Sequence, residues 1–402
     1  MEFIIKQNTL KEELGFIQGV VERKSTIPIL SNILIESLGE NEIRILGTDL
    51  DVTIRCDAEA EIKQPGSMCI QARKLFDIVR TLEGGDVHFK KVENEWVQLK
   101  SGRANFRLAG VSREQYPEIP IFKSAPLKLP SDVFNYFIHN TAFAITNEQS
   151  RFTLSGAKFM IADGKARMVT TDGHRLAFIE KEVEDLGGEK MDALIPKKAL
   201  TELVKISRGS DGDIHFGEDQ NHIYFQSGGR LLITRKLSGN FPNYEMVMPK
   251  DNDKTIVFDL EEMKNAVRRI SLMADERNRS IRMTVRKTEV EITAQSSEEG
   301  EGQEFVPAEY SSDEEITLGF NWQYLQEFLN NVGALEAAGP AGDESPGESS
   351  VKEIDGDKVR VKESKNPARI SFEFRDANAA TQIRIAGDTA YDYKYIVMPL
   401  RI

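Results

Sequence analysis

The sequence has 402 residues, 40% of them hydrophobic, and a formal net charge of −13. A chain of this length is expected to form two to four domains of about 100 to 200 residues, and its acidic balance by itself argues against a nucleic-acid partner. Its two cysteines, Cys56 and Cys69, indicate neither a zinc site nor a disulfide scaffold. Because no apolar stretch approaches about 18 residues and the N-terminus lacks a basic flank before an apolar stretch, we expect a soluble cytoplasmic protein.

The sequence repeats one pattern of elements three times. Each copy opens with apolar residues at three- and four-residue spacing, in Thr9–Val21, Ser131–Ile145 and Asp259–Met273. A second helical pattern starts at positions that are 124 residues apart, namely Ala72, Pro196 and Phe320. This period is far longer than the roughly 20 to 50 residues of solenoid repeats, so each copy is expected to be a complete domain. The predicted boundaries are 1–122, 123–250 and 251–402.

Short alternating segments between the helical patterns predict β-strands. Examples are NILIES from Asn32, ARMVTT from Ala166 and VEITAQ from Val290. Strands outnumber helices, and turn signals such as ADGK and SDGD separate them. This pattern predicts the α+β class, with antiparallel sheets and two helices on one face in each domain.

The third copy contains an additional segment near 334–367. It is rich in Gly, Pro, Ser and Glu, and this composition buries too little apolar area to offset the entropy of ordering. We expect a surface insertion that is at least partly disordered.

Charge is unevenly distributed along the chain. Residues 298–315 contain eight acidic residues and no basic one, whereas residues 259–287 contain eight basic and five acidic residues. On one helix such a pattern usually marks a solvated surface. Its recurrence on several predicted helices favours a cationic surface on an acidic protein.

The sequence carries none of the common enzyme motifs. It contains no GxxxxGK[ST], HExxH or GxSxG, and no GxGxxG after a strand. The cluster TDGHRL makes Asp172, His174 and Arg175 neighbours, but residues this close on a strand or turn point in different directions. The first copy has TDLDVT at Thr48, without a histidine. A structural or recognition role is therefore favoured over catalysis, and no cofactor or metal ion is expected.

Eight blocks of sequence together indicate a family. In chain order they are ILSNILIE at Ile29, GTDLD at Gly47, ARKLFDI at Ala72, SGR at Ser101, VTTDGHRLAF at Val169, FPNYEMVMP at Phe241, GFNWQYL at Gly319 and YIVMPLRI at Tyr395. With these blocks the chain resembles the bacterial DNA polymerase III beta subunit, the replicative sliding clamp, along essentially its full length. The resemblance implies three tandem clamp domains and a head-to-tail homodimer that closes a ring around double-stranded DNA.

The same resemblance implies a processivity factor that is not an enzyme. It would tether the catalytic subunit of DNA polymerase III, the clamp loader, other polymerases and repair proteins. Basic residues on the helices that line the ring would face DNA phosphates: Lys24, Arg73, Arg80, Lys197, Lys198, Lys205, Lys264, Arg268 and Arg269. Such contacts carry no base sequence and are expected to be weak and salt-dependent, so that the ring slides.

A seam between subunits also follows from the resemblance. Leu272 and Met273 match the family's apolar pair, and Phe106 and Leu108 are their expected partners. The acidic residues Glu298, Glu299, Glu301 and Glu304 would face the basic residues Lys74, Arg103 and Arg107. Rim charges of this kind steer association, while the apolar centre supplies most of the affinity.

Finally, the resemblance implies a cleft that binds short peptides of partner proteins. Its residues would be Leu154, Thr171, Gly173, His174, Arg175, Leu176, Pro242, Val247, Asn321, Tyr324, Met398, Pro399, Leu400 and Arg401. Met246 stands where relatives often carry a basic residue, and the chain ends Leu-Arg-Ile rather than Met-Arg-Leu. The peptide preference is therefore expected to differ in detail.

Two alternative functions stay open at the level of sequence. One is a hydrolase that uses Asp172 and His174. The other is a repeat scaffold that binds no nucleic acid.

Overall fold

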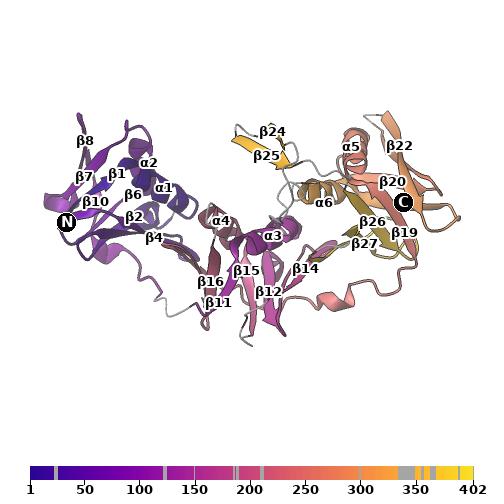
Figure 1. Ribbon diagram of the computed structural model, residues 1–402, viewed down its shortest axis with the longest axis horizontal. Helices are drawn as coiled ribbons and strands as arrows, with labels where there is room; N and C mark the ends of the chain where they lie inside the picture. The colour runs from indigo at the N-terminus through magenta and orange to yellow at the C-terminus, as the bar shows by residue number, and fades with distance from the viewer. Residues whose placement is uncertain are drawn as a thin grey trace. The chain divides into compact units, whose positions relative to one another are not determined.

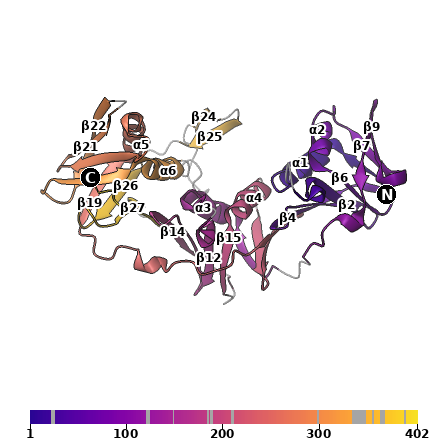
Figure 2. The ribbon, with the colours of Figure 1, turned by 180° about the vertical axis from the view of Figure 1, so that it is seen from behind.

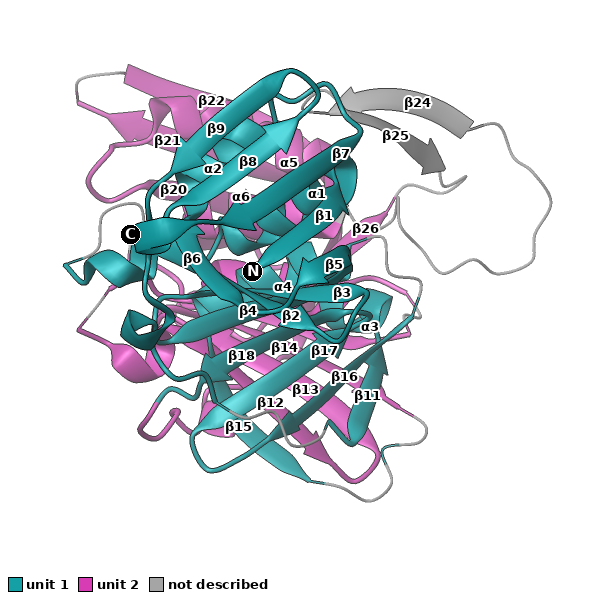
Figure 3. Cartoon of the chain, turned by 90° about the vertical axis from the view of Figure 1, so that its left-hand side faces the viewer, with its two compact units in different colours: residues 1–135, 186–237 teal, residues 136–185, 238–402 magenta. Residues whose placement is uncertain are grey.

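The computed structural model describes residues 1–21, 26–120, 125–148, 150–183, 186, 190–208, 212–297, 300–333, 349–354, 357–362, 368–387 and 390–401. These residues belong to two compact units (Figure 3). Unit 1 comprises residues 1–135 and 186–237, and unit 2 comprises residues 136–185 and 238–402. The chain of the predicted middle domain is thus divided between the two units.

Six α-helices lie in the described residues, two for each predicted repeat. They are α1 (Gln7–Ile17), α2 (Ala72–Val79), α3 (Ser131–Thr141), α4 (Lys197–Ser207), α5 (Leu260–Ile270) and α6 (Trp322–Gly333). The regularly spaced apolar residues that predicted α5, among them Leu260, Met263 and Val267, form the buried face of the helix. The Asp259 side chain accepts a hydrogen bond from the Glu262 N–H at 2.9 Å and caps the helix. The predicted helical patterns are confirmed.

Two antiparallel sheets belong to unit 1. The first has the order β5-β1-β7-β8-β9, from β1 (Glu2–Lys6), β5 (Glu61–Gln64), β7 (Asp86–Lys91), β8 (Val97–Ser101) and β9 (Ala104–Leu108). The second has the order β10-β6-β2-β3-β4-β18-β17-β16-β11, from β2 (Asn32–Leu38), β3 (Glu42–Thr48), β4 (Val52–Glu59), β6 (Ser67–Gln71), β10 (Gly110–Val111), β11 (Leu127–Pro130), β16 (Asp213–Glu218), β17 (His222–Ser227) and β18 (Arg230–Arg235). A further strand, β15 (Met191–Pro196), leads directly into α4.

The strands of unit 2 follow the order β12-β13-β14-β28-β27-β26-β19-β22-β21-β20-β23. Their bounds are β12 (Gly156–Ala162), β13 (Lys165–Thr171), β14 (Arg175–Glu182), β19 (Lys254–Asp259), β20 (Ser280–Val285), β21 (Glu289–Ser296), β22 (Gly300–Tyr310), β23 (Ile316–Asn321), β26 (Arg369–Phe374), β27 (Thr381–Ile385) and β28 (Asp392–Val397). The two strands β24 (Ser349–Ile354) and β25 (Asp357–Lys362) pair with each other within the predicted insertion. The rest of the segment 334–367 lies outside the described residues.

Aromatic side chains form the cores between helices and sheets. In unit 1, Phe3 stacks on Phe89 with ring centroids 4.8 Å apart, and both are fully buried. In unit 2, Phe328 of α6 stacks on Tyr395 of β28 at 5.0 Å. Burying one such side chain stabilises a fold by roughly 1.5 to 3 kcal/mol. Figures 1 and 2 show α5 and α6 side by side, and both helices contact the sheet of unit 2. The α+β class with antiparallel sheets is confirmed.

Candidate functional site

The TDGHRL segment is a tight turn between β13 and β14. The Asp172 carboxylate accepts hydrogen bonds from the N–H groups of His174 at 2.9 Å and Arg175 at 3.1 Å. The Thr171 hydroxyl donates to the Arg175 carbonyl at 2.6 Å and accepts from the Gly173 N–H at 3.0 Å. Gly173 has a φ of +91°, a region that glycine enters without a steric penalty. This network holds the backbone of His174 at an exposed position.

The first repeat forms the same turn. The Leu50 N–H donates to the Thr48 hydroxyl at 3.0 Å, and the Val52 N–H donates to the Asp49 carboxylate at 2.7 Å. Leu50 takes the place of Gly173 and has a φ of +79°, which is strained for a residue with a side chain. The same Thr-Asp turn occurs in a repeat without a histidine. The role of its carboxylate is therefore to accept hydrogen bonds from backbone N–H groups. This geometry gives no support to a hydrolase built on Asp172.

Arg175 is the buried centre of a polar network below this turn. Its guanidinium donates to the Asp172 carboxylate at 2.9 Å and to the Phe143 carbonyl at 2.8 Å, and it pairs with Glu327 of α6. It also stacks over the Tyr324 ring at 4.4 Å, and only 7% of its side chain is exposed. Burial by itself would lower the pKa of Arg175, but Tyr395 and Glu327 raise it, so the guanidinium stays charged. Arg175 therefore supports the predicted cleft from beneath rather than offering donors to a ligand.

Tyr395 completes this network. Its hydroxyl donates to the Tyr324 carbonyl at 3.1 Å and lies 3.4 Å from the Arg175 guanidinium. Burial raises the pKa of the Tyr395 hydroxyl above its ordinary value. The network connects β14, α6 and β28, three elements from distant parts of the chain.

Other segments of unit 2 are hydrogen-bonded to this turn or to strand β23. The Met398 N–H donates to the His174 carbonyl at 3.0 Å, and the Leu400 N–H donates to the Gly319 carbonyl at 2.8 Å. The Arg151 guanidinium donates to the Asp172 carbonyl at 2.8 Å and so ties the 3₁₀ turn Phe152–Leu154 to it. The predicted cleft residues of β14, α6 and the C-terminal segment are thus brought together.

Exposure divides the predicted cleft residues into three groups. The exposed residues are Gly173, His174, Pro242, Met398 and Arg401. The partly exposed residues are Val247, Asn321, Tyr324, Pro399 and Leu400. The buried residues are Leu154, Thr171, Arg175 and Leu176.

Sequence reasoning missed two contributors near this turn. Phe152 is 71% exposed at the start of the 3₁₀ turn that Arg151 ties to Asp172, and an aromatic residue in a polar turn was the signal that could have identified it. Glu327 had no such signal, because its pairing with Arg175 spans 152 residues. Met246, noted in the sequence, is 83% exposed in the 3₁₀ turn Tyr244–Met246.

The predicted DNA-facing residues of α2 have an acidic neighbour. The Arg80 guanidinium lies 3.1 Å from the Asp77 carboxylate, and the Arg73 guanidinium lies 3.9 Å from it. Both arginine side chains are more than half exposed. Lys24 lies outside the described residues.

Carboxylates also accompany the predicted cations of α4. Lys198 pairs with Asp49 of the first repeat's turn. The Lys205 ammonium lies 2.8 Å from the Glu202 carboxylate, whose side chain is only 5% exposed. Lys197 is the first residue of the helix.

On α5 the three predicted cations differ. The Lys264 ammonium lies 3.1 Å from the Glu261 carboxylate, and Arg269 pairs with Glu304 of β22. Arg268 is exposed and has no carboxylate partner among the residues that the structure describes. The predicted cationic surface is therefore partly neutralised by acids of the same chain.

Three of the predicted seam residues lie on the edge strand β9. Phe106, Arg107 and Leu108 belong to β9, the last strand of its sheet. Arg103 lies in the turn before β9, and Lys74 lies on α2.

The other predicted seam residues lie near β22. Leu272 is 74% exposed, whereas Met273 packs so close to Gly302 of β22 that a Cβ there would lie 3.0 Å from the Met273 Cγ. Glu301 is exposed on β22, and Glu304 is already paired with Arg269. The predicted seam residues Glu298 and Glu299 lie outside the described residues.

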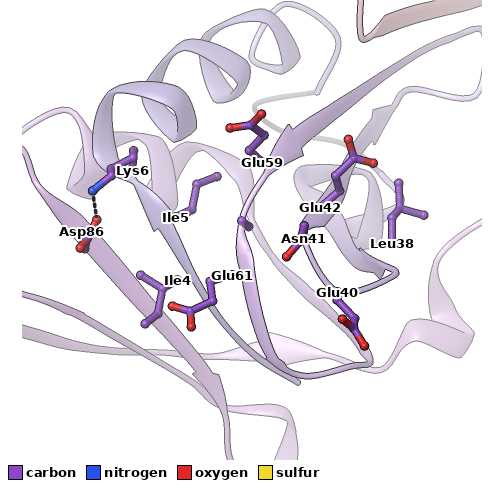
Figure 4. A pocket seen from close by; sticks show the side chains of 11 residues that line it. Ile4, Ile5, Lys6, Leu38, Glu40, Asn41, Glu42, Glu59, Glu61 and Asp86 are labelled. Atoms are coloured by element: carbon purple, nitrogen blue, oxygen red, sulfur yellow. Dashed lines mark hydrogen bonds and ion pairs between the residues drawn. The ribbon is translucent and has the colours of Figure 1, made fainter.

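The structure also contains an acidic cavity of about 660 Å³ in unit 1 (Figure 4). Glu40, Glu42, Glu59 and Glu61 line it, and Lys6 donates to Asp86 at 2.7 Å at one side. No group of three or more His, Cys, Asp or Glu side chains in the described residues is placed to hold a metal ion. Likewise, no described helix is long and apolar enough to cross a membrane.

Comparison with known proteins gives consistent matches along the chain. Residues 1–120, 128–243 and 245–337 match the N-terminal, central and C-terminal domains of the DNA polymerase III beta subunit. A beta sliding clamp of Pseudomonas aeruginosa is 30% identical over 404 residues, with 100% of both chains covered. The crystal structure of the DNA polymerase III subunit beta from the same organism superposes with a TM-score of 0.86 at 26% identity, covering 100% of both chains. A sliding clamp from Bacillus subtilis gives a TM-score of 0.86 at 25% identity, covering 100% of this chain and 99% of that one.

Proposed function

The chain belongs to the DNA polymerase III beta subunit family, and we propose on that basis that two copies close head to tail into a sliding clamp around duplex DNA. The family is a non-catalytic subunit of the polymerase. The proposed role is to hold the replicative polymerase, the clamp loader and repair proteins on DNA by topology rather than by tight binding.

Two open strand edges carry the proposal of a ring. In the described residues, β9 pairs only with β8, and residues Gly300–Pro307 of β22 pair only with β21. Open edges of this kind expose unpaired backbone groups and are normally covered. An edge-to-edge contact between β9 of one copy and β22 of the next covers both, and the same contact formed twice closes a dimer.

The predicted charges support this pairing of edges. Arg103 and Arg107 are exposed beside β9, while Glu301 is exposed on β22. Opposite charges of this kind steer two copies toward each other and set the register of the contact.

The proposed DNA contact uses the helices rather than the sheets. Arg73, Arg80 and Arg268 are exposed on or beside α2 and α5, where they reach phosphates without reading bases. The neighbouring carboxylates limit the strength of the attraction. Weak contacts of this kind suit a ring that must slide along DNA.

The proposed partner site is the cleft around the TDGHRL turn. Exposed His174 and Met398 are joined by a backbone hydrogen bond, and the partly exposed Tyr324 stacks on buried Arg175, the residue that follows His174. Methionine adapts to differently shaped ligands, and the rigid network beneath keeps the surface in place. This combination suits a short extended peptide shared by several partners.

A cytoplasmic location completes the proposal. Cys56 and Cys69 are buried free thiols, and burial raises the pKa of both, that of Cys69 to about 11. Unpaired thiols are usual in a reducing compartment such as the cytoplasm.

Loading onto closed and open DNA tests the proposed ring. We expect the protein, once placed by a clamp loader on a nicked circular plasmid, to remain bound through gel filtration and to be lost when the plasmid is linearised. Retention that survives linearisation would show tight binding instead of encirclement. A complete failure to remain on the circle would favour the alternative of a scaffold that binds no nucleic acid.

Peptide binding tests the cleft separately. A series of fluorescent peptides that covers the sequence of the matching polymerase is screened, and the peptide that binds is titrated with wild-type protein, with Tyr324→Ala and with Leu272→Ala. We expect Tyr324→Ala to weaken binding about tenfold or more, as for an aromatic interface residue, and Leu272→Ala to leave it unchanged. Equal affinity of all three proteins would place the peptide elsewhere.

A further inference from the structure

Phe305 is an aromatic side chain exposed at the open edge of β22. Half of it, 50%, is accessible to solvent, although it lies in the middle of a strand. Its neighbours Glu304 and Val306 face the other way, because Glu304 pairs with Arg269 of α5 and Val306 is buried. Side chains alternate along a strand, so Phe305 stands on the face opposite to α5.

The open edge of β9 presents a matching feature. Phe106 pairs in register with Leu99, which pairs with Phe89, and the last two are fully buried. Arg107 therefore stands on the opposite, solvent-facing side of β9. Its guanidinium lies 4.7 Å from the centre of the Trp96 ring and forms a cation–π pair with it.

A groove accompanies this pair at the end of β9. It has a volume of about 730 Å³, and Trp96, Arg107, Leu108 and Lys74 are among the residues that line it. The groove is thus cationic and partly apolar. It suits an aromatic ring that arrives together with acidic residues.

The two edges match when they are brought together. We consider β9 and β22 paired edge to edge, so that the buried faces of their two sheets form one continuous face. On that face, Phe106 and Leu108 of one copy then lie next to Met273 of the other. The solvent face of β9, with Arg107, then meets the solvent face of β22, with Phe305 and the acidic Glu301. The occupant indicated by this geometry is a second copy of the chain.

We propose that Phe305 of one copy packs on the Trp96–Arg107 pair of the next and closes the solvent side of the seam with an aromatic contact. This inference rests on the head-to-tail seam of the proposed function. It adds Trp96 and Phe305 to the dimer interface. On the solvent-facing side of that interface, the sequence had indicated only charged residues. Since the contact buries apolar area, the seam depends less on salt than one held by ion pairs alone.

Sedimentation of single variants tests the contact. We expect Phe305→Ala and Trp96→Ala each to raise the dimer dissociation constant about 10- to 100-fold, as is usual for central aromatic residues of an interface. Phe152→Ala is the matched control, because Phe152 is 71% exposed at the cleft and should leave the dissociation constant unchanged. Circular dichroism verifies that each variant is folded.

A double-mutant cycle and a spectroscopic probe exclude an indirect effect. If the two rings touch, Phe305→Ala combined with Trp96→Ala weakens the dimer by clearly less than the product of the two single effects. The chain has two tryptophans, Trp96 and Trp322. In a Trp322→Phe background, dilution below the dissociation constant should shift the emission of Trp96 to longer wavelength, because its ring becomes exposed to water. With Phe305→Ala, the dimer itself should already emit at the longer wavelength, so that dilution causes no further shift.

The outcomes separate this inference from the proposed ring. A wild-type protein that stays monomeric at all concentrations overturns both. A wild-type dimer whose dissociation constant is unaffected by Phe305→Ala, or whose two single effects multiply in full, overturns the aromatic contact and leaves the ring intact.

Discussion

Arg175 in β14 and Glu327 in α6 form an ion pair across 152 residues of sequence. The pair lies beneath the predicted peptide cleft, where Asp172, Phe143 and Tyr324 complete the coordination of the guanidinium. A buried cation held from several sides fixes the surface above it. The cleft is therefore built on a polar support inside unit 2.

Removal of this support should destabilise unit 2. Arg175→Met leaves the Asp172 and Glu327 carboxylates without their partner, and breaking a buried pair in this way costs about 3 to 5 kcal/mol. Urea unfolding followed by Trp322 fluorescence, in a Trp96→Phe background, measures the loss. The control is Arg384→Met, whose ion pair with Asp392 is 40% exposed on the arginine side and should cost at most about 1 kcal/mol. Equal losses in both variants would contradict the role given to Arg175.

The stability of unit 1 should depend on pH through Asp219. Burial would raise the pKa of this carboxyl, but hydrogen bonds from the Tyr224 hydroxyl and from the N–H groups of Asn221 and His222 outweigh it and lower the pKa to about 2. The folded state thus favours the charged form. Its contribution is complete above the ordinary value of 3.8 and is lost as the pH falls toward 2.

The stability of the variant Asp219→Asn should change less with pH than that of the wild type. We expect it to be less stable than the wild type by about 1 kcal/mol at pH 7, a value reduced because the side chain is 35% exposed, and to approach wild-type stability near pH 2. Urea midpoints at pH 7, 4, 3 and 2 give the comparison, with Asp51→Asn as the variant of an exposed carboxylate. A difference that stays constant over this range would show that Asp219 does not carry the effect.

The seam between subunits should depend on Leu272. Its side chain is 74% exposed in the monomer, so truncation costs little in folding but removes apolar area from the proposed dimer. We expect Leu272→Ala to weaken dimerisation about tenfold or more, and the double change with Met273→Ala to give monomers in analytical ultracentrifugation. Met246→Ala is the control, since that exposed methionine lies at the cleft. Intact dimers of the double variant at low concentration would count against this seam.

DNA contact should distinguish two adjacent arginines. Arg269 is held by Glu304, whereas Arg268 has no carboxylate partner among the described residues. We expect Arg268→Ala to reduce retention on circular DNA and to lower the salt slope by about 1, the effect of one phosphate contact, with a smaller change for Arg269→Ala. Salt-dependent retention of both variants provides the measurement. Identical slopes for Arg268→Ala and the wild type would remove Arg268 from the DNA-facing surface.

Much of the fold could be predicted because its signals are local. Apolar spacing gave the helices, and alternation gave strands such as β13 and β21, since both periods are set by the backbone geometry of a single element. The positions of charged partners could not be predicted in this way. The family resemblance placed Arg269 among the DNA-facing cations, but its pairing with Glu304 depends on how α5 packs on β22.

The candidate site shows the same division. The TDGHRL turn was predicted as turn chemistry, and the geometry of Asp172 confirms it, because that network involves only neighbouring residues. The convergence of Met398 on His174 was expected only from the family resemblance. The exposure of Phe152 and Phe305 was not predicted, because a hydrophobic residue on a strand or turn is normally assigned to the core.

By itself, the sequence determined a threefold repeat and its α+β class, since both follow from order and spacing along one dimension, and the resemblance of its sequence blocks indicated the family to which the chain belongs. Only the tertiary structure decided that most predicted cations have acidic partners, that Arg175 is buried, and that β9 and the segment Gly300–Pro307 of β22 have open edges. The physical reason is that neutralisation, burial and open edges are properties of neighbours in space. Those neighbours are set by the register of strands and the packing of helices that lie tens to hundreds of residues apart.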